Sequence, residues 1–269
     1  KQAVYFINYF GFSPSPSILN YLSELQRAGR IVIEDNAQAG FLTHVTGDFA
    51  FNSMRKLCPF DGGYLKTAYD IEPYLAAYTG RENRRLPLIR QYRSQLRDYL
   101  FQDIGDRESL EALFALSESY YARDGVVLGD EQERQQIEHL DWSAIKQVRR
   151  QNYTKLLRSI AGIGAISPIF PALQPENMPL GLPVYVSNGL RDALNDYLGE
   201  NGIGLTIHWE DLVCDPRLNG NALAVEMTRN ILTLAIDQYT SQKQLDFLSQ
   251  QLADFAETVN RSWYSGMHN

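Results

Sequence analysis

The chain has 269 residues, of which 44% are hydrophobic and 21% are charged, and its formal net charge is −7. This composition is typical of a folded protein with a sizeable core and excludes an intrinsically disordered chain. The acidic balance argues against nucleic acid as the main partner, because phosphate contacts need a basic face. The length predicts two domains or one large one.

The two cysteines, Cys58 and Cys214, form neither a disulfide framework nor a zinc-ligand pattern, so the sequence indicates no metal site. A reduced, cytoplasmic setting fits this cysteine usage. No apolar run reaches ~18 residues, so we expect no transmembrane helix and no membrane partner. The apolar start of the chain, residues 1–10, is interpreted as a strand rather than a signal peptide.

The first part of the chain predicts a strand–helix–strand unit. Residues 3–10 (AVYFINYF) form the first strand, Ser17 is expected to cap the helix, and residues 31–33 (IVI) form a second, buried strand. This order predicts two parallel strands. Ligands of open α/β sheets bind beyond the carboxyl ends of such strands, where Asn8 and Asp35 lie.

Two further short strands are expected at residues 47–53 and 62–67, followed by mostly helical structure over residues 69–160. The run RENRR (81–85) within this region is interpreted as a solvated segment, although phosphate-bearing sugar nucleotides also attract arginines.

A Gly- and Pro-rich segment after residue 160 predicts a domain boundary. Beyond it, alternating short strands and helices predict a small α+β domain. Ser241 and Gln244 form a capping box for a long final helix. We therefore expect two domains, residues 1–160 and 161–269.

Polar side chains gather where the predicted strands end: Asp35, Gln38, Ser53, Arg55 and Lys56. Pyridoxal phosphate needs a lysine for its Schiff base and a carboxylate against its pyridine nitrogen. An amide can bond the ring hydroxyl, and a serine and an arginine can bind the phosphate. The residues alone leave an alternative open, in which Asp35 caps a turn and Lys56 lies in solvent.

Three segments resemble motifs of the DegT/DnrJ/EryC1/StrS sugar aminotransferase family of fold-type-I pyridoxal phosphate enzymes. They are VIEDNAQA (32–39), GDFAFNSMRK (47–56) and DGGYL (61–65). Segments nearer the C-terminus, such as RRQNYTKLL and ILTLAIDQ, are similar as well, so the resemblance covers nearly the whole chain. It implies an α/β fold with a mixed, mainly parallel sheet and a smaller C-terminal α+β domain.

The resemblance implies a role for each of the five clustered residues. Lys56 would form the Schiff base and move the proton, and Asp35 would pair with the pyridinium nitrogen. Gln38 would lie against the hydroxyl side of the ring, and Ser53 would contact the phosphate. Arg55 would bind phosphate or act as the cationic neighbour that lowers the pKa of Lys56.

Two further residues are candidate substrate contacts by resemblance. Asn8 stands in NYFG, which is similar to the family's strand end. His208 ends a predicted strand where the family often has a histidine near the mouth of the active site. A packed histidine at the edge of the sheet is the alternative for His208.

The implied activity is transfer of an amino group from an amino acid to a keto-sugar, which we expect to be nucleotide-linked, by a pyridoxal phosphate-dependent homodimer. The family also has an N-terminal segment, which holds a helix start that grips the phosphate. The resemblance begins after that segment, so we expect this sequence to belong to a longer protein. Two alternatives stay open: another pyridoxal phosphate reaction such as sugar dehydration, and a non-catalytic scaffold or regulatory relative.

One departure from the family bears on the lysine. The stretch from Ser53 to Lys56 is shorter than the family's usual serine-to-lysine stretch. Relatives that dehydrate sugars replace the lysine with histidine, so the presence of Lys56 favours amino transfer.

Overall fold

The computed structural model describes residues 2–40, 45–218 and 220–266, which divide into two compact units. The first unit contains residues 2–7, 19–37 and 45–140. The second unit contains residues 8–18, 38–40, 141–218 and 220–266. The predicted domain division at residue 160 stays a prediction, and in the structure the helix that precedes it belongs to the second unit.

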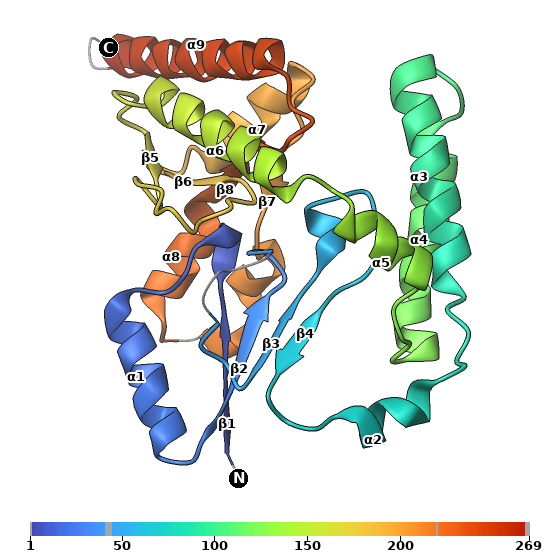
Figure 1. Cartoon of the computed structure of the whole chain (residues 1–269). Coiled ribbons are helices and arrows are strands. Elements are labelled where there is room, and N and C mark those ends of the chain that lie inside the picture. Colours follow the sequence, from blue (N-terminus) through green and yellow to red (C-terminus); the bar gives the residue numbers. More distant parts are fainter. Residues whose placement is uncertain (1, 41–44, 219, 267–269) are drawn as a thin grey trace. The chain divides into compact units, whose positions relative to one another are not determined.

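The first unit is built on a four-stranded sheet in the order β1-β2-β3-β4 (Figure 1). The strands are β1 (Ala3–Ile7), β2 (Ile31–Asn36), β3 (Phe49–Asn52) and β4 (Leu65–Thr67). The first three strands are parallel, and β4 is antiparallel to β3. The predicted strand–helix–strand unit and the mixed, mainly parallel sheet are therefore confirmed.

Helix α1 (Pro16–Arg27) connects β1 to β2. The predicted cap at Ser17 was wrong, because the helix begins at Pro16 and Ser17 lies inside it. Proline is well suited to a first helical position, where its missing N–H has no partner to lose. The Ser17 hydroxyl instead lies 2.9 Å from that of Ser15.

Strand β2 has one buried face and one half-buried face, so the prediction of a buried IVI strand holds for Val32 and not for Ile31 and Ile33. The buried face carries Val32, Glu34 and Asn36, and the half-buried face carries Ile31, Ile33 and Asp35. Successive side chains of a strand point to opposite faces, which places the two neighbouring carboxylates on different sides of the sheet.

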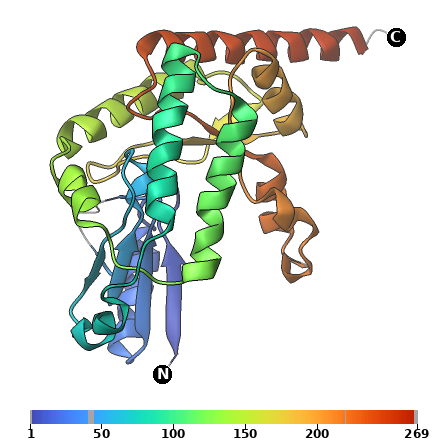
Figure 2. The same cartoon turned by 90° about the vertical axis from the view of Figure 1, so that its right-hand side faces the viewer.

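The helical part of the first unit follows β4. It consists of α2 (Glu72–Leu75), a short 3₁₀ turn η3 (Ala76–Tyr78), α3 (Arg85–Gln102), α4 (Arg107–Asp124) and α5 (Glu131–Glu138). Helices α3 and α4 pack side by side as a hairpin (Figure 2). Asp103 ends α3 in the left-handed region at φ 57°, and Asp106 caps α4 by accepting the Ser109 N–H at 2.8 Å.

The second unit contains an antiparallel sheet in the order β5-β6-β8-β7. Its strands are β5 (Ile166–Pro168), β6 (Leu182–Val186), β7 (Thr206–Ile207) and β8 (Ile231–Leu234). Its helices are α6 (Trp142–Ser159), α7 (Arg191–Glu200), α8 (Ala222–Asn230) and α9 (Gln242–Gly266). Three short 3₁₀ turns complete it: η1 (Tyr9–Gly11), η4 (Glu210–Cys214) and η5 (Pro216–Leu218).

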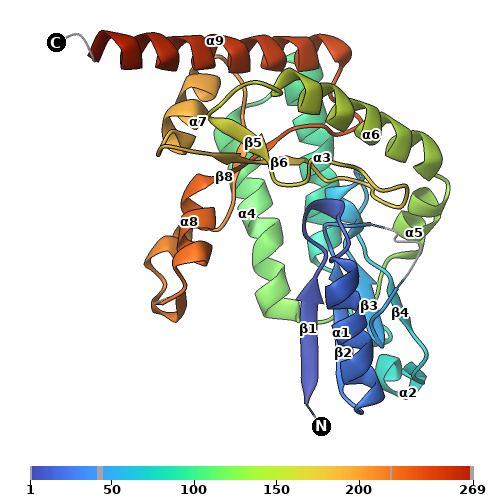
Figure 3. The ribbon, with the colours of Figure 1, turned by 90° about the vertical axis from the view of Figure 1, so that its left-hand side faces the viewer.

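Helices α6 and α7 both pack against α9 (Figure 3). The core between the sheet and these helices contains fully buried leucines and valines, among them Leu156, Leu182, Val184, Leu194, Leu234, Leu245 and Leu252. The predicted capping box is confirmed, because Ser241 N donates to Gln244 Oε1 at 2.8 Å and Gln244 N donates to Ser241 Oγ at 3.3 Å. Within the described ranges, no helix is long and apolar enough to cross a membrane.

Candidate active site

Asp35 lies at the end of β2 with both carboxylate oxygens engaged. Its Oδ1 accepts the Ala37 N–H at 2.7 Å, and its Oδ2 accepts the hydroxyl of Tyr5 on the neighbouring strand β1. The alternative in which Asp35 caps a turn is therefore observed for Oδ1, one of its two carboxylate oxygens. Each carboxylate oxygen has more than one acceptor position, so Asp35 retains the capacity to accept a further N–H.

Glu34, the preceding residue, has a structural role on the opposite face of the sheet. It is 2% exposed, and its carboxylate accepts the N–H groups of Thr46 at 2.7 Å and Gly47 at 2.8 Å. The Asn36 amide donates to the other oxygen at 3.1 Å. These charge-assisted hydrogen bonds offset the cost of burying the carboxylate and hold the segment that leads into β3.

The Ser53–Lys56 stretch begins directly after β3 and forms a single 3₁₀ turn, η2 (Met54–Lys56). Met54 is fully buried and anchors the turn, and its N–H donates to Gly62 O at 2.9 Å. Gly63 lies just before β4. A Cβ on it would lie 2.4 Å from Asn52 O, so only a glycine fits where this segment approaches β3. The Ser53 hydroxyl makes no hydrogen bond within the part of the chain that the structure describes.

Lys56 has a pKa below its ordinary value. Its side chain is exposed by surface area, yet neighbouring atoms partly desolvate the amine, and this partial burial is the main cause of the shift. The positive charge of Arg55 lowers the pKa further, whereas the negative charge of Asp35 opposes the shift. Lys56 and Asp35 thus interact electrostatically, as a cofactor site that uses both would require.

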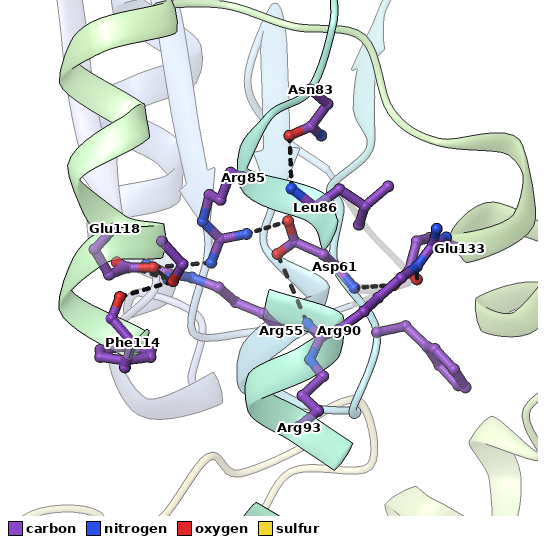
Figure 4. Close-up of polar contacts among 12 residues, drawn as sticks. Arg55, Asp61, Asn83, Arg85, Leu86, Arg90, Arg93, Phe114, Glu118 and Glu133 are labelled. Carbon is purple, nitrogen blue, oxygen red and sulfur yellow. Dashed lines mark hydrogen bonds and ion pairs between the residues drawn. The ribbon is translucent and has the colours of Figure 1, made fainter. Parts of the chain in front are cut away.

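Arg55 is held by an acidic side chain from α4. Its guanidinium donates to both Glu118 oxygens, at 2.9 and 3.0 Å (Figure 4). It also lies over the Tyr121 ring. Burial alone would raise the pKa of Glu118, but hydrogen bonds from Arg85 and Arg55 keep that pKa below its ordinary value. Arg55 therefore already has an anionic partner, and its role toward a cofactor stays a prediction.

Two cavities of the first unit meet at Arg55. Ser53 and Arg55 line a cavity of about 230 Å³ together with Tyr120 and Tyr121. Arg55 and Lys56 line a second cavity of about 340 Å³ that reaches α3 and α4. The structure thus brings Ser53, Arg55 and Lys56 to one region.

Arg85 lines both cavities and was not among the residues that the sequence indicated for the site. The RENRR run that contains it was interpreted as a solvated segment, and this was wrong for Arg85, which is only 4% exposed. Its acidic partners, Asp61 and Glu118, come from elements far apart in the chain. No local signal in the sequence pairs these residues.

In the second unit, Gln38 fixes the turn after β1. Its Oε1 accepts the Phe10 N–H at 2.9 Å. Phe10 has φ 57° and Gly11 has φ 88°, and a Cβ on Gly11 would lie 2.2 Å from Met178 O. The predicted contact between Gln38 and a cofactor ring stays a prediction, and the observed role is to hold this strained turn.

The two candidate substrate contacts also belong to the second unit. Asn8 is 1% exposed and precedes the η1 turn. His208 Nε2 lies 2.8 Å from Thr233 Oγ1, and its ring meets the Phe10 ring edge-on at 5.1 Å. This geometry is the one that the packed-histidine alternative describes, so a substrate role for either residue stays a prediction.

The donor set of the first unit fits pyridoxal phosphate. An ionisable carboxylate that can accept a further N–H, an amine with a lowered pKa and a serine hydroxyl without a partner among the described residues are the groups that this cofactor needs. Asp35, Lys56 and Ser53 supply them.

Comparison with known proteins gives the fold but no close relative. No protein-family model matches the chain, and no curated protein matches it either. Solved structures do match over nearly the whole chain. A DegT DnrJ EryC1 StrS aminotransferase from Brucella abortus has 17% identity and a TM-score of 0.55 over 95% of this chain and 64% of its own. DesV from S. venezuelae has 20% identity and a TM-score of 0.61 over 95% of this chain and 65% of its own.

A third match is a Streptococcus pneumoniae protein named as a sugar aminotransferase and solved in a PMP-form. It has 14% identity and a TM-score of 0.62, with 98% of this chain and 70% of that chain covered. The chain therefore spans about two thirds of the length of these structures. At such identities the similarity shows the fold, which is that of the fold-type-I sugar aminotransferases.

Proposed function

We propose that this chain belongs to a pyridoxal 5′-phosphate-dependent aminotransferase. The enzyme transfers an amino group from an amino acid to a keto-sugar, which we expect to be nucleotide-linked, and acts as a cytoplasmic homodimer. The observation that carries the proposal is Lys56, whose pKa is lowered and whose amine interacts with Asp35 in a sugar-aminotransferase fold.

In this proposal, each of the three residues from the first unit has its own role. Lys56 anchors the cofactor, and its lowered pKa increases the unprotonated fraction that can attack an aldehyde or accept a proton. Asp35 accepts the ring N–H, and Tyr5 and the Ala37 N–H orient its carboxylate. Ser53 donates its hydroxyl to the phosphate. When bound, the cofactor supplies an electron sink for the bonds at the amino carbon.

Three further contacts are part of the proposal. Gln38 follows Asp35 by three positions and is assigned to the hydroxyl side of the ring, with Asn8 and His208 assigned to the substrate. The cytoplasmic setting agrees with Cys58 and Cys214, neither of which forms a disulfide.

The test is reductive labelling of the protein with pyridoxal phosphate. The protein is incubated with the cofactor and reduced with borohydride, and the modified peptide is mapped by mass spectrometry. We expect the label on Lys56, its loss in Lys56→Gln, and its retention in the matched control Lys66→Gln on β4. Label spread equally over several surface lysines would overturn the proposal.

The same experiment separates a second candidate function, a non-catalytic relative of the fold. Two contacts favour that candidate: Asp35 Oδ1 caps the turn at Ala37, and Arg55 is neutralised by Glu118. A folded protein that takes no label at Lys56 would support it.

A further inference from the structure

A network of ion pairs connects Arg55 to the helical part of the first unit (Figure 4). It joins four arginines to four carboxylates: Arg55, Arg85, Arg90 and Arg93 with Asp61, Glu118, Asp130 and Glu133. As a whole the network is balanced in charge. The part of it that lines the cavity beside Lys56 is not.

Four cationic side chains face this cavity of about 340 Å³, and Glu118 is the one acidic residue among those that line it. The cations are Arg55, Lys56, Arg85 and Arg93, and the apolar wall consists of Ile89, Tyr92 and Phe114. The lining therefore has a formal charge of +3 in a protein whose net charge is −7, counting four cations against one carboxylate.

Arg85 provides a second, independent observation. Its side chain is 5% exposed, and its two terminal nitrogens donate to Asp61 and, at 2.8 Å, to Glu118. Its Nε is buried and has no hydrogen-bond partner among the residues that the structure describes. A buried N–H without an acceptor is costly, and an anion that accepts from this nitrogen would remove the cost.

We propose that this cavity binds the phosphate group of a small phosphorylated molecule, with Arg55, Arg85 and Arg93 as the donors. A phosphate carries more charge and more acceptor oxygens than a carboxylate, so it compensates three guanidinium groups better. The Tyr92 and Phe114 rings, 5.1 Å apart, offer an apolar surface for the organic part of the molecule.

The position of Lys56 agrees with an anion at this place. Arg55 depresses the pKa of the Lys56 amine, and a bound phosphate would offset that charge and raise the pKa. The site deepens the proposed function and rests on it for the identity of the ligand. It needs no Schiff base at Lys56, so a failure of phosphate binding and a failure of the lysine label are distinguishable results. The phosphate could belong to a nucleotide-linked substrate, to the cofactor or to a free ion.

The test is isothermal titration of the protein with three probes: inorganic phosphate, uridine diphosphate and pyridoxamine 5′-phosphate, which has no aldehyde to react with Lys56. Saturable binding of at least one probe is expected. The tightest probe identifies the source, because a nucleotide site prefers uridine diphosphate and a cofactor site prefers pyridoxamine phosphate.

Variants then locate the binding. Arg93→Gln should weaken binding roughly tenfold or more, the effect of losing one charge-assisted hydrogen bond. Glu118→Gln removes the competing carboxylate and should tighten binding. The matched control is Arg97→Gln, which removes the same charge from a 69% exposed side chain of the same helix and should leave the affinity unchanged.

Two results would overturn the proposal. One is the absence of saturable binding for all three probes by the folded protein. The other is equal weakening by Arg93→Gln and Arg97→Gln, which would show a general charge effect instead of a site. The Glu118→Gln arm keeps the test informative if Arg93→Gln does not fold, because tighter binding supports the site and unchanged binding contradicts it.

Discussion

The Gly47 N–H donates to the buried carboxylate of Glu34 at 2.8 Å, and a Cβ at position 47 would lie only 2.6 Å from the Cβ of Glu34. The two residues thus fit each other in both polarity and space. This contact places the start of β3 beside β2, and through β3 it places Ser53 and Lys56 beside Asp35.

Gly47→Ala is expected to destabilise the protein by about 1–3 kcal/mol, because the new methyl group collides with Glu34 and with Phe49 O. Urea unfolding followed by circular dichroism measures the change. The control is Gly129→Ala, where nothing lies within 4 Å of the new atom. Equal stability of the two variants would contradict the close packing at Gly47.

Glu34→Gln should cost about 1–3 kcal/mol of stability, because the amide group cannot accept hydrogen bonds at both of its ends as the carboxylate does. Glu24→Gln in α1, an exposed position, removes the same charge and should leave the urea midpoint within experimental error. A Glu34→Gln protein as stable as this control would show that the buried charge is not needed.

The pKa of Lys56 should respond in opposite directions to its two charged neighbours. Arg55→Gln removes a cation that disfavours the ammonium form, so the pKa should rise toward its ordinary value. Asp35→Asn removes an anion that favours the ammonium form, so the pKa should fall further. The pH dependence of trace acetylation, read at the Lys56 peptide, measures both: the reaction should begin at higher pH in the first variant and at lower pH in the second. Shifts of the same sign would contradict the assigned neighbours.

Arg149 in α6 should be essential for the stability of the second unit. It is 2% exposed and donates to Gln238 Oε1 at 2.8 Å and to the carbonyls of Pro179 and Leu180 at 3.2 Å. Arg149→Met removes these buried hydrogen bonds and should cost about 2–4 kcal/mol. Arg158→Met, at an exposed position of the same helix, should cost less than about 1 kcal/mol. Thermal unfolding of both variants decides, and similar midpoints would refute the role of Arg149.

The sequence by itself determined the features that neighbouring residues specify. Short apolar segments predicted the strands that end near Asp35 and Ser53. The capping box predicted the start of α9, because its two hydrogen bonds join residues three positions apart. The resemblance of three short motifs predicted the aminotransferase fold, which the solved structures confirm.

Only the tertiary structure decided how the charges near Lys56 are paired. Arg55 and Glu118 are 63 positions apart, and Arg85 and Glu118 are 33 apart. Such pairs form because the α3–α4 hairpin brings Glu118 back to Arg85 and to Arg55, and no local sequence pattern specifies this contact. Glu34 and Asp35 lie on opposite faces of β2 and have different roles: Glu34 holds a loop, and Asp35 belongs to the candidate site. Which role each residue has depends on which face of the sheet is covered. Segments distant in the chain determine which face is covered. They also bury Arg85, although the charged composition of the RENRR run predicted a solvated segment.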